Sequence, residues 1–175
     1  MLKKIELGML IGPLILFGCA ASSALWSSNP TFEQVENPYF RALVEPKRNV
    51  DGFFVMFHLK VTNRSNENLE VDWNESQYLF QGQEAGPLVP IGMDPRLVRK
   101  GRIPLEKIAP GQTITKDIGP YRFVSLTPLP NKSAEKRQPS ISFDPLPAGY
   151  NGVQLVIHSR DKAVVEALQM RISTK

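Results

Sequence analysis

The sequence predicts an all-β protein, an antiparallel β-sandwich of seven or eight strands. The 175 residues include 15 prolines and 12 glycines, a composition that disfavours long helices. Several short segments alternate apolar and polar residues, and clusters of turn-forming residues separate them at close intervals. With 42% hydrophobic residues, the chain can bury a sizeable core within one domain.

The clearest predicted strand is Phe53–Thr62, with the sequence FFVMFHLKVT. Its period-two alternation of aromatic and β-branched residues indicates a strand with one face on the core. A shorter strand, Tyr39–Glu45, precedes it, and Pro46–Gly52 is predicted to connect the two. The residues expected to face the core are Phe53, Val55, Phe57, Leu59 and Val61.

Further strands and turns follow in order. The polar run Asn63–Asn68 predicts a chain reversal, and residues 69–73 alternate again. A strand is expected at Gln77–Gln81, whereas the Gly- and Pro-rich stretch Gly82–Arg102 predicts no regular structure. Pro110-Gly111 predicts a turn. After it we expect strands at Thr113–Ile118 and Tyr121–Leu126 and a loop at Pro128–Pro139.

The C-terminal part of the chain predicts a hairpin. Asn151-Gly152 is expected to form a turn before an alternating strand, and Ser159–Lys162 forms the next turn. The last segment, AVVEALQMRIS, has helical propensity, but a short turn joins it to the preceding strand. Its alternation favours a strand whose inward residues are Leu168, Met170 and Ile172.

The N-terminus predicts a secretory signal peptide. Lys3 and Lys4 precede the apolar run Leu7–Phe17, which is too short for a membrane-spanning helix of about 20 residues. The run ends at Cys19, the only cysteine, so the exported domain is expected to contain no disulfide. An ordinary buried free cysteine is the alternative interpretation.

Leu16-Phe17-Gly18-Cys19 resembles the lipobox of bacterial lipoproteins. The resemblance implies cleavage between Gly18 and Cys19, a diacylglycerol on the Cys19 thiol, and acylation of the new amine. Each buried methylene contributes about 0.8 kcal/mol, so two or three acyl chains such as palmitate would anchor the protein to a membrane. In Gram-negative lipoproteins an Asp after the cysteine commonly favours inner-membrane retention. Ala20 therefore favours the outer membrane, with the domain in the periplasm or at the surface.

The predicted organisation has three parts: a signal peptide at 1–18, the lipidated Cys19 with a flexible tether at 19–37, and the sandwich at 38–175. The segments FFVMFHLKVTNRSNENLEV, SQYLFQ and APGQT and the terminal hairpin resemble the immunoglobulin-like domains of bacterial surface lipoproteins. That resemblance implies an immunoglobulin-like sandwich. It implies no particular activity, because one fold hosts many functions.

The net charge is +4 at pH 7, or about +3 after loss of Lys3, Lys4 and Glu6 (4 − 2 + 1). This mildly positive net charge does not require a nucleic-acid partner, and export from the cell disfavours one. No nucleophile elbow or zinc-protease motif is present in the sequence, so we expect neither an enzyme nor a cofactor.

Metal binding is a weaker expectation. His58 and His158 are both predicted on outward strand faces. Met56 lies on the same face as His58, and an imidazole together with a thioether would suit copper. A blue-copper site also needs a thiolate, so surface histidines and no metal site are the favoured interpretation. Four acids around one turn are expected either to be solvated or to form a weak calcium site: Glu67, Glu70, Asp72 and Glu75.

One basic segment is a candidate binding surface. Four cations occur within seven residues, Arg96, Arg99, Lys100 and Arg102, where they would attract anionic headgroups or an acidic protein. A solvated loop is the alternative. The function expected from these features is a lipid-anchored, non-enzymatic binding or assembly module of the cell envelope, partnered by another envelope protein or by headgroups. An envelope carrier of a small ligand or metal is the second hypothesis.

Overall fold

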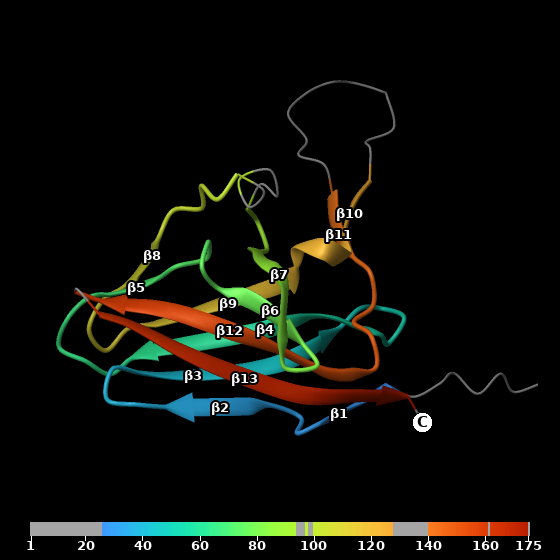
Figure 1. Ribbon diagram of the computed structural model, residues 1–175, viewed down its shortest axis with the longest axis horizontal. Coiled ribbons are helices and arrows are strands. Elements are labelled where there is room, and N and C mark those ends of the chain that lie inside the picture. The colour runs from blue at the N-terminus through green and yellow to red at the C-terminus, as the bar shows by residue number, and fades with distance from the viewer. Residues whose placement is uncertain (1–25, 94–96, 98–99, 128–139, 161, 175) are drawn as a thin grey trace, which may run out of the picture.

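The computed structural model describes residues 26–93, 97, 100–127, 140–160 and 162–174. These residues form an all-β, sandwich-like fold of antiparallel strands with a single-turn 3-10 helix, η1 (Tyr121–Phe123) (Figure 1). The predicted fold class is confirmed. The described residues form thirteen strands rather than seven or eight, because several segments expected to be loops pair in the sheet. None of the helices in these residues is long and apolar enough to cross a bilayer.

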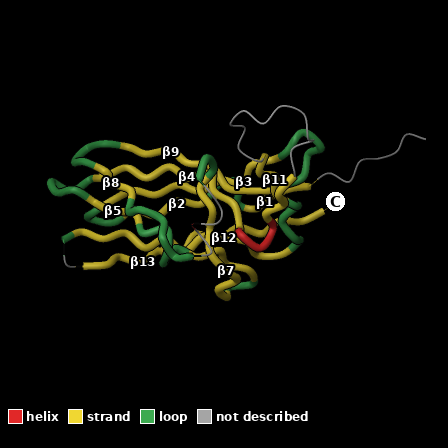
Figure 2. The backbone as a smooth tube through the Cα atoms, turned by 90° about the horizontal axis from the view of Figure 1, so that it is seen from above, coloured by secondary structure: helices red, strands yellow, loops and turns green. Residues whose placement is uncertain are grey.

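Eleven strands form one sheet that curls into two layers, which we call the first and second layers. The first layer contains β1 (Trp26–Asn29), β13 (Lys162–Thr174), β12 (Gly149–Ser159), β6 (Gln77–Phe80), β5 (Leu69–Val71) and β8 (Glu106–Ile108). The second contains β2 (Glu33–Glu36), β3 (Phe40–Arg48), β4 (Phe54–Asn63) and β9 (Thr113–Pro120). Figure 2 shows β9 and β4 on one side and β12 and β13 on the other. β10 (Val124–Thr127) and β11 (Ser140–Phe143) form a separate pair.

β7 (Gln83–Pro90) joins the two layers. Its first half pairs with β6 up to Pro87, and its last three residues, Leu88–Pro90, pair with β9. We place the bend of β7 at Gly86, just before the strand changes partner from β6 to β9. The φ of Gly86 is 113°, which is unfavourable for residues with a side chain. The prediction of an irregular stretch at Gly82–Arg102 is therefore wrong for the eight residues of β7.

The chain also changes layers at its N-terminal side. β1 pairs with β13 in the first layer, and β2 pairs with β3 in the second. The predicted tether at 19–37 is thus wrong for Trp26–Asn29 and Glu33–Glu36. Small polar residues suggested flexibility, but their backbone groups complete the hydrogen bonding of neighbouring strands. The prediction for residues 19–25 lies outside the described residues.

The core lies between the layers. Val55, Phe57, Leu59 and Val61 are buried as predicted, whereas Phe53 is half-buried before the strand begins. The predicted inward residues of the last strand are also buried. The largest fully buried side chains are Trp73, Tyr78, Phe40, Phe57, Leu59, Leu69, Leu88, Ile108, Ile118, Leu146, Leu155 and Ile157.

Three local predictions need correction. β3 continues to Arg48, so the first part of the predicted connection Pro46–Gly52 is strand. Tyr121–Phe123 forms η1, and only the following residues form a strand. Asn151 and Gly152 lie inside β12 and form no turn. The predicted loop at Pro128–Pro139 lies outside the described residues.

Asn151 shows why Asn-Gly was misleading. The buried Asn151 Oδ1 accepts a hydrogen bond from Tyr78 Oη at 2.5 Å, and its Nδ2 donates to the Pro147 carbonyl at 2.8 Å. A Cβ atom on Gly152 would collide with the Leu168 carbonyl oxygen. The Asn151-Gly152 dipeptide is therefore explained by buried contacts between strands and not by a turn. Burial also raises the pKa of Tyr78, so its hydroxyl stays protonated as a donor.

The sandwich has two different ends, which we name by their contents. The terminal end holds Trp26 paired with Thr174, together with the β3–β4 turn around Val50. The hairpin end holds the turn after β4, the Pro110-Gly111 turn and the β12–β13 turn at Arg160 (Figure 1).

Candidate functional site

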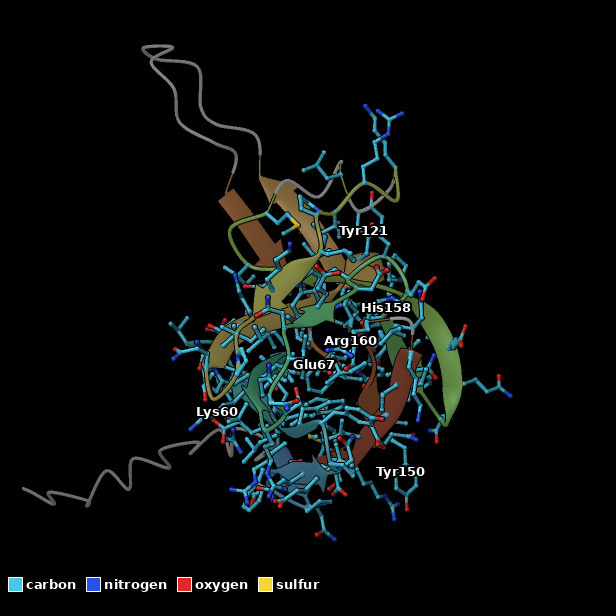
Figure 3. The ribbon with its side chains drawn as sticks, turned by 90° about the vertical axis from the view of Figure 1, so that its left-hand side faces the viewer. Lys60, Glu67, Tyr121, Tyr150, His158 and Arg160 are labelled. Carbon is cyan, nitrogen blue, oxygen red and sulfur yellow. The ribbon has the colours of Figure 1, made fainter. Side chains whose placement is uncertain are left out.

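A polar hollow of about 490 Å³ lies at the hairpin end. Its walls come from the turn after β4, the start of the β8–β9 connection and the end of β12. Figure 3 looks at this end and places His158, Arg160 and Glu67 close together, with Lys60 and Tyr150 at the periphery. The lining residues are Asn66, Glu67, Asn68, Glu70, Pro110, His158 and Arg160.

Asn63 holds the first wall in place. This buried side chain donates hydrogen bonds from Nδ2 to the carbonyl oxygens of Glu67, at 2.7 Å, and Ile108, at 2.8 Å. Its Oδ1 accepts from the backbone N–H of Ser65 at 2.9 Å. The predicted polar turn at Asn63–Asn68 is confirmed, and it is fixed against β8 by these bonds.

The second wall is the β12–β13 hairpin, whose predicted turn is confirmed by pairing of Ser159 with Lys162. Arg160 occupies the left-handed region, with φ of 49°, and its Nε lies 2.8 Å from Glu67 Oε2. Both residues of this ion pair line the hollow. The Arg160 side chain is 76% exposed, so the pair contributes little to stability but its charges are available to a ligand.

Beside the hollow, three potential metal ligands come together: Asp72, Glu75 and His158. His158 Nε2 lies 3.5 Å from Asp72 Oδ2 and 3.9 Å from Glu75 Oε2. The side chains differ in exposure, at 14% for Asp72, 30% for His158 and 62% for Glu75. His158 belongs both to this cluster and to the lining of the hollow.

The turn that follows β5 orients Asp72. Its Oδ1 accepts the backbone N–H of Asn74 at 2.8 Å and that of Glu75 at 3.2 Å. Ser76 ties the turn to β12, because its hydroxyl donates to the Asp72 carbonyl and accepts the Val156 N–H at 3.1 Å. These bonds occupy Oδ1 and leave Oδ2 directed at His158.

The two histidines predicted on outward strand faces lie in different layers of the structure. His58 lies in the second layer, where its Nδ1 is 2.7 Å from Asp117 Oδ1. Lys47 Nζ lies 2.5 Å from Asp117 Oδ2. Burial tends to raise the pKa of Asp117, but hydrogen bonds from Lys47 and His58 outweigh it and hold the pKa below the ordinary value. Within the described residues, His58 joins no group of three potential ligands.

The four acids around the predicted turn divide between two places. Glu67 and Glu70 line the hollow, whereas Asp72 and Glu75 meet His158. The sequence did not indicate that His158 would join two of the acids. Pairing of Glu70 with His158 across β5 and β12 brings them together, and residues so far apart in sequence give no local signal for that register.

The basic segment is described only in part. Lys100 and Arg102 are exposed, while Arg96 and Arg99 lie outside the described residues, as do Gly18 and Cys19. Asn74 donates from Nδ2 to the Ile103 carbonyl at 2.8 Å and accepts the Ile103 N–H at 2.9 Å. These two bonds place the end of the basic segment beside the turn that carries Asp72.

Comparisons with protein families, with curated proteins and with solved structures found no match to this chain.

Proposed function

We propose that this protein is a lipid-anchored, non-enzymatic binding or assembly module of the bacterial envelope, and that the hollow at the hairpin end holds its partner. The proposal rests on one observation: the N-terminal strand β1 and the hollow lie at opposite ends of the sandwich. The strand nearest Cys19 in sequence begins at Trp26, at the terminal end, and the hollow lies at the other end.

The distance between Cys19 and Trp26 supports this orientation. Six residues separate them, so the seven Cα–Cα steps span at most about 25 Å at roughly 3.5 Å each. An acylated Cys19 would keep the terminal end near the bilayer and direct the hairpin end away from it. An outer-membrane location remains part of the proposal, based on Ala20.

The lining of the hollow suits a polar partner. Glu67 and Glu70 offer carboxylates, Arg160 offers a guanidinium, and Asn66 and Asn68 have amide side chains. Such a mixture can pair with a peptide segment that carries both hydrogen-bond donors and acceptors. We therefore favour another envelope protein as the partner.

The basic segment is a second proposed contact, for anionic headgroups or an acidic surface. Its described residues Lys100 and Arg102 are exposed and stand near the turn at Asp72. The alternative function, a carrier of a small ligand or metal, is favoured by the cluster of Asp72, Glu75 and His158.

Two experiments test the anchored and binding parts separately. Cys19→Ser should release the protein from membranes, and mass spectrometry of the native N-terminus should find acyl groups on Cys19. An unmodified Cys19 in membrane-extracted protein would refute the anchor.

For the binding part, a photo-crosslinking amino acid replaces Asn68 in the hollow or, as a control, the fully exposed Val50 at the terminal end. We expect one defined protein adduct from position 68 and none from position 50. The adduct from position 68 should be lost when Arg160→Ala is added. Equal adducts from both positions, or none from position 68, would refute the hollow as the binding site.

A further inference from the structure

We infer that Asp72, Glu75 and His158 bind a divalent transition ion of the zinc class. The inference does not depend on lipidation at Cys19 or on the partner proposed for the hollow. It rests on three side chains of different chemistry that converge from two strands, β5 with its following turn and β12.

The spacing of the ligand atoms suits a small ion. Zn²⁺ binds histidine nitrogen and carboxylate oxygen at about 2.0–2.2 Å, usually with tetrahedral geometry, so two ligand atoms lie roughly 3.4 Å apart. His158 Nε2 is 3.5 Å from Asp72 Oδ2 and 3.9 Å from Glu75 Oε2. The three ligand atoms lie within 4.8 Å of one another, so small side-chain rotations bring them to binding distance.

Two of the ligands are held in position before any ion binds. Asp72 accepts two backbone N–H groups through Oδ1, and its Oδ2 faces the imidazole. His158 is in the regular part of β12, opposite Glu70 of β5. Only Glu75, which is largely exposed, must be ordered on binding. Pre-ordering lowers the entropy cost of forming the site.

The donor set distinguishes between ions. Imidazole suits zinc, copper, iron and nickel, whereas Ca²⁺ takes six to eight oxygen ligands. One nitrogen and two carboxylates therefore favour a transition ion over the calcium considered for the acids alone. Three protein ligands leave a fourth position open on the ion, and His158 also lines the hollow. A bound ion would thus lie beside the space proposed for the partner.

The test uses the full chain, purified in detergent, treated with a chelator and titrated with Zn²⁺ against a chromogenic competitor. We expect one equivalent to bind, with an affinity that falls on acidification because the imidazole nitrogen must be unprotonated. Ca²⁺ should bind at least about tenfold more weakly. His158→Ala should weaken Zn²⁺ binding at least about tenfold, and Glu75→Gln should weaken it without affecting the fold, because Glu75 is largely exposed.

The matched control is His58→Ala, which removes the other histidine from the second layer and should leave Zn²⁺ binding unchanged. Circular dichroism of each variant checks that the sheet is intact. Zn²⁺ binding that survives both His158→Ala and Glu75→Gln, or that is lost in His58→Ala, would overturn the assignment. Absence of a stoichiometric Zn²⁺ site in the folded wild-type chain would overturn it equally.

Discussion

β4 and β7 are both long strands, yet they relate differently to the two layers. β4 stays within the second layer, between β3 and β9, and its residues alternate between core and outer face from Val55 to Val61. β7 begins in the first layer with exposed residues and ends in the second with three consecutive buried ones, Leu88–Pro90. One strand builds a layer and the other connects two.

The difference explains why β4 could be predicted from a period-two alternation of apolar residues and β7 could not. A strand in one layer has one face on the core throughout, so its apolar residues recur with period two. A strand that changes layers also changes its neighbours, so no single period describes it. Gly86 and Pro87 permit the bend in β7 and at the same time make the segment look like a loop.

The largest expected effect tests the alternation in β4. Phe57→Ala should lower the free energy of unfolding by about 3–5 kcal/mol, because a fully buried ring is lost from the core. Lys60→Ala, on the outer face of the same strand, should change it by roughly 0.5 kcal/mol or less. Denaturant titration measures both, and equal values would contradict the assigned faces.

The next effect tests the burial of the second half of β7. Leu88→Ala should cost about 2–5 kcal/mol, because the side chain is fully buried where β7 joins β9. Glu84→Ala, in the exposed first half, is the control and should stay within roughly 0.5 kcal/mol, as it loses only an exposed hydrogen bond from Gln154. Thermal unfolding measures both variants. If Leu88→Ala lowers stability no more than Glu84→Ala does, the assignment of the second half of β7 to the second layer is contradicted.

A smaller effect tests the bend itself. Gly86→Ala should destabilise the protein by about 1–3 kcal/mol through backbone strain, because φ is 113°. A Cβ atom there would meet no atom within 4 Å, so steric collision does not contribute. Unchanged stability in urea would mean that the bend lies elsewhere in β7.

Beside the outer face of β4, Asp117 provides a pH-dependent comparison. Its pKa is lowered in the folded state, so its ionised form stabilises the fold above the unfolded value of about 3.9, and the contribution is lost as pH falls through the folded pKa. Asp117→Asn should cost about 0.5–1 kcal/mol at neutral pH, since the carboxylate is partly solvated. Urea titrations from pH 7 to 2 should show the difference shrinking below about pH 4.

The smallest effect on stability is expected in the segment between β7 and β8. Replacing Arg96, Arg99, Lys100 and Arg102 with Ser should leave unfolding nearly unchanged and weaken binding to anionic vesicles, as should added salt. Vesicle sedimentation measures the binding, with neutral vesicles as the control. Binding that resists both treatments would assign the lipid contact to another surface.

The sequence predicted the elements whose signal is local. β4, the last hairpin and the Asn63–Asn68 turn follow from alternation and turn residues, and the structure confirms them. β1, β2 and β7 did not follow, because their pairing depends on distant strands that supply the hydrogen-bond partners. The turn predicted at Asn151-Gly152 was wrong for a related reason, because the buried residues that these two contact, Tyr78 and Leu168, lie elsewhere in the chain.

The candidate site was predictable only in fragments. The acids around residues 67–75 were visible in the sequence, but their division between the hollow and His158 depends on the register of β5 against β12. His158 and His58 look alike in the sequence, as outward histidines on alternating strands. They differ in the structure because one faces two carboxylates and the other is held by Asp117.

The pairing of β1 with β13 has a mechanical consequence if Cys19 is the anchor. A pull between the bilayer and a partner held at the hairpin end would enter the domain at Trp26 and run along the strands. The backbone hydrogen bonds that join residues 26–29 to residues 171–174 lie across that direction. They would share the load in shear rather than opening one after another. Tension on the anchor would then be resisted first by the four-residue pairing of β1 with β13.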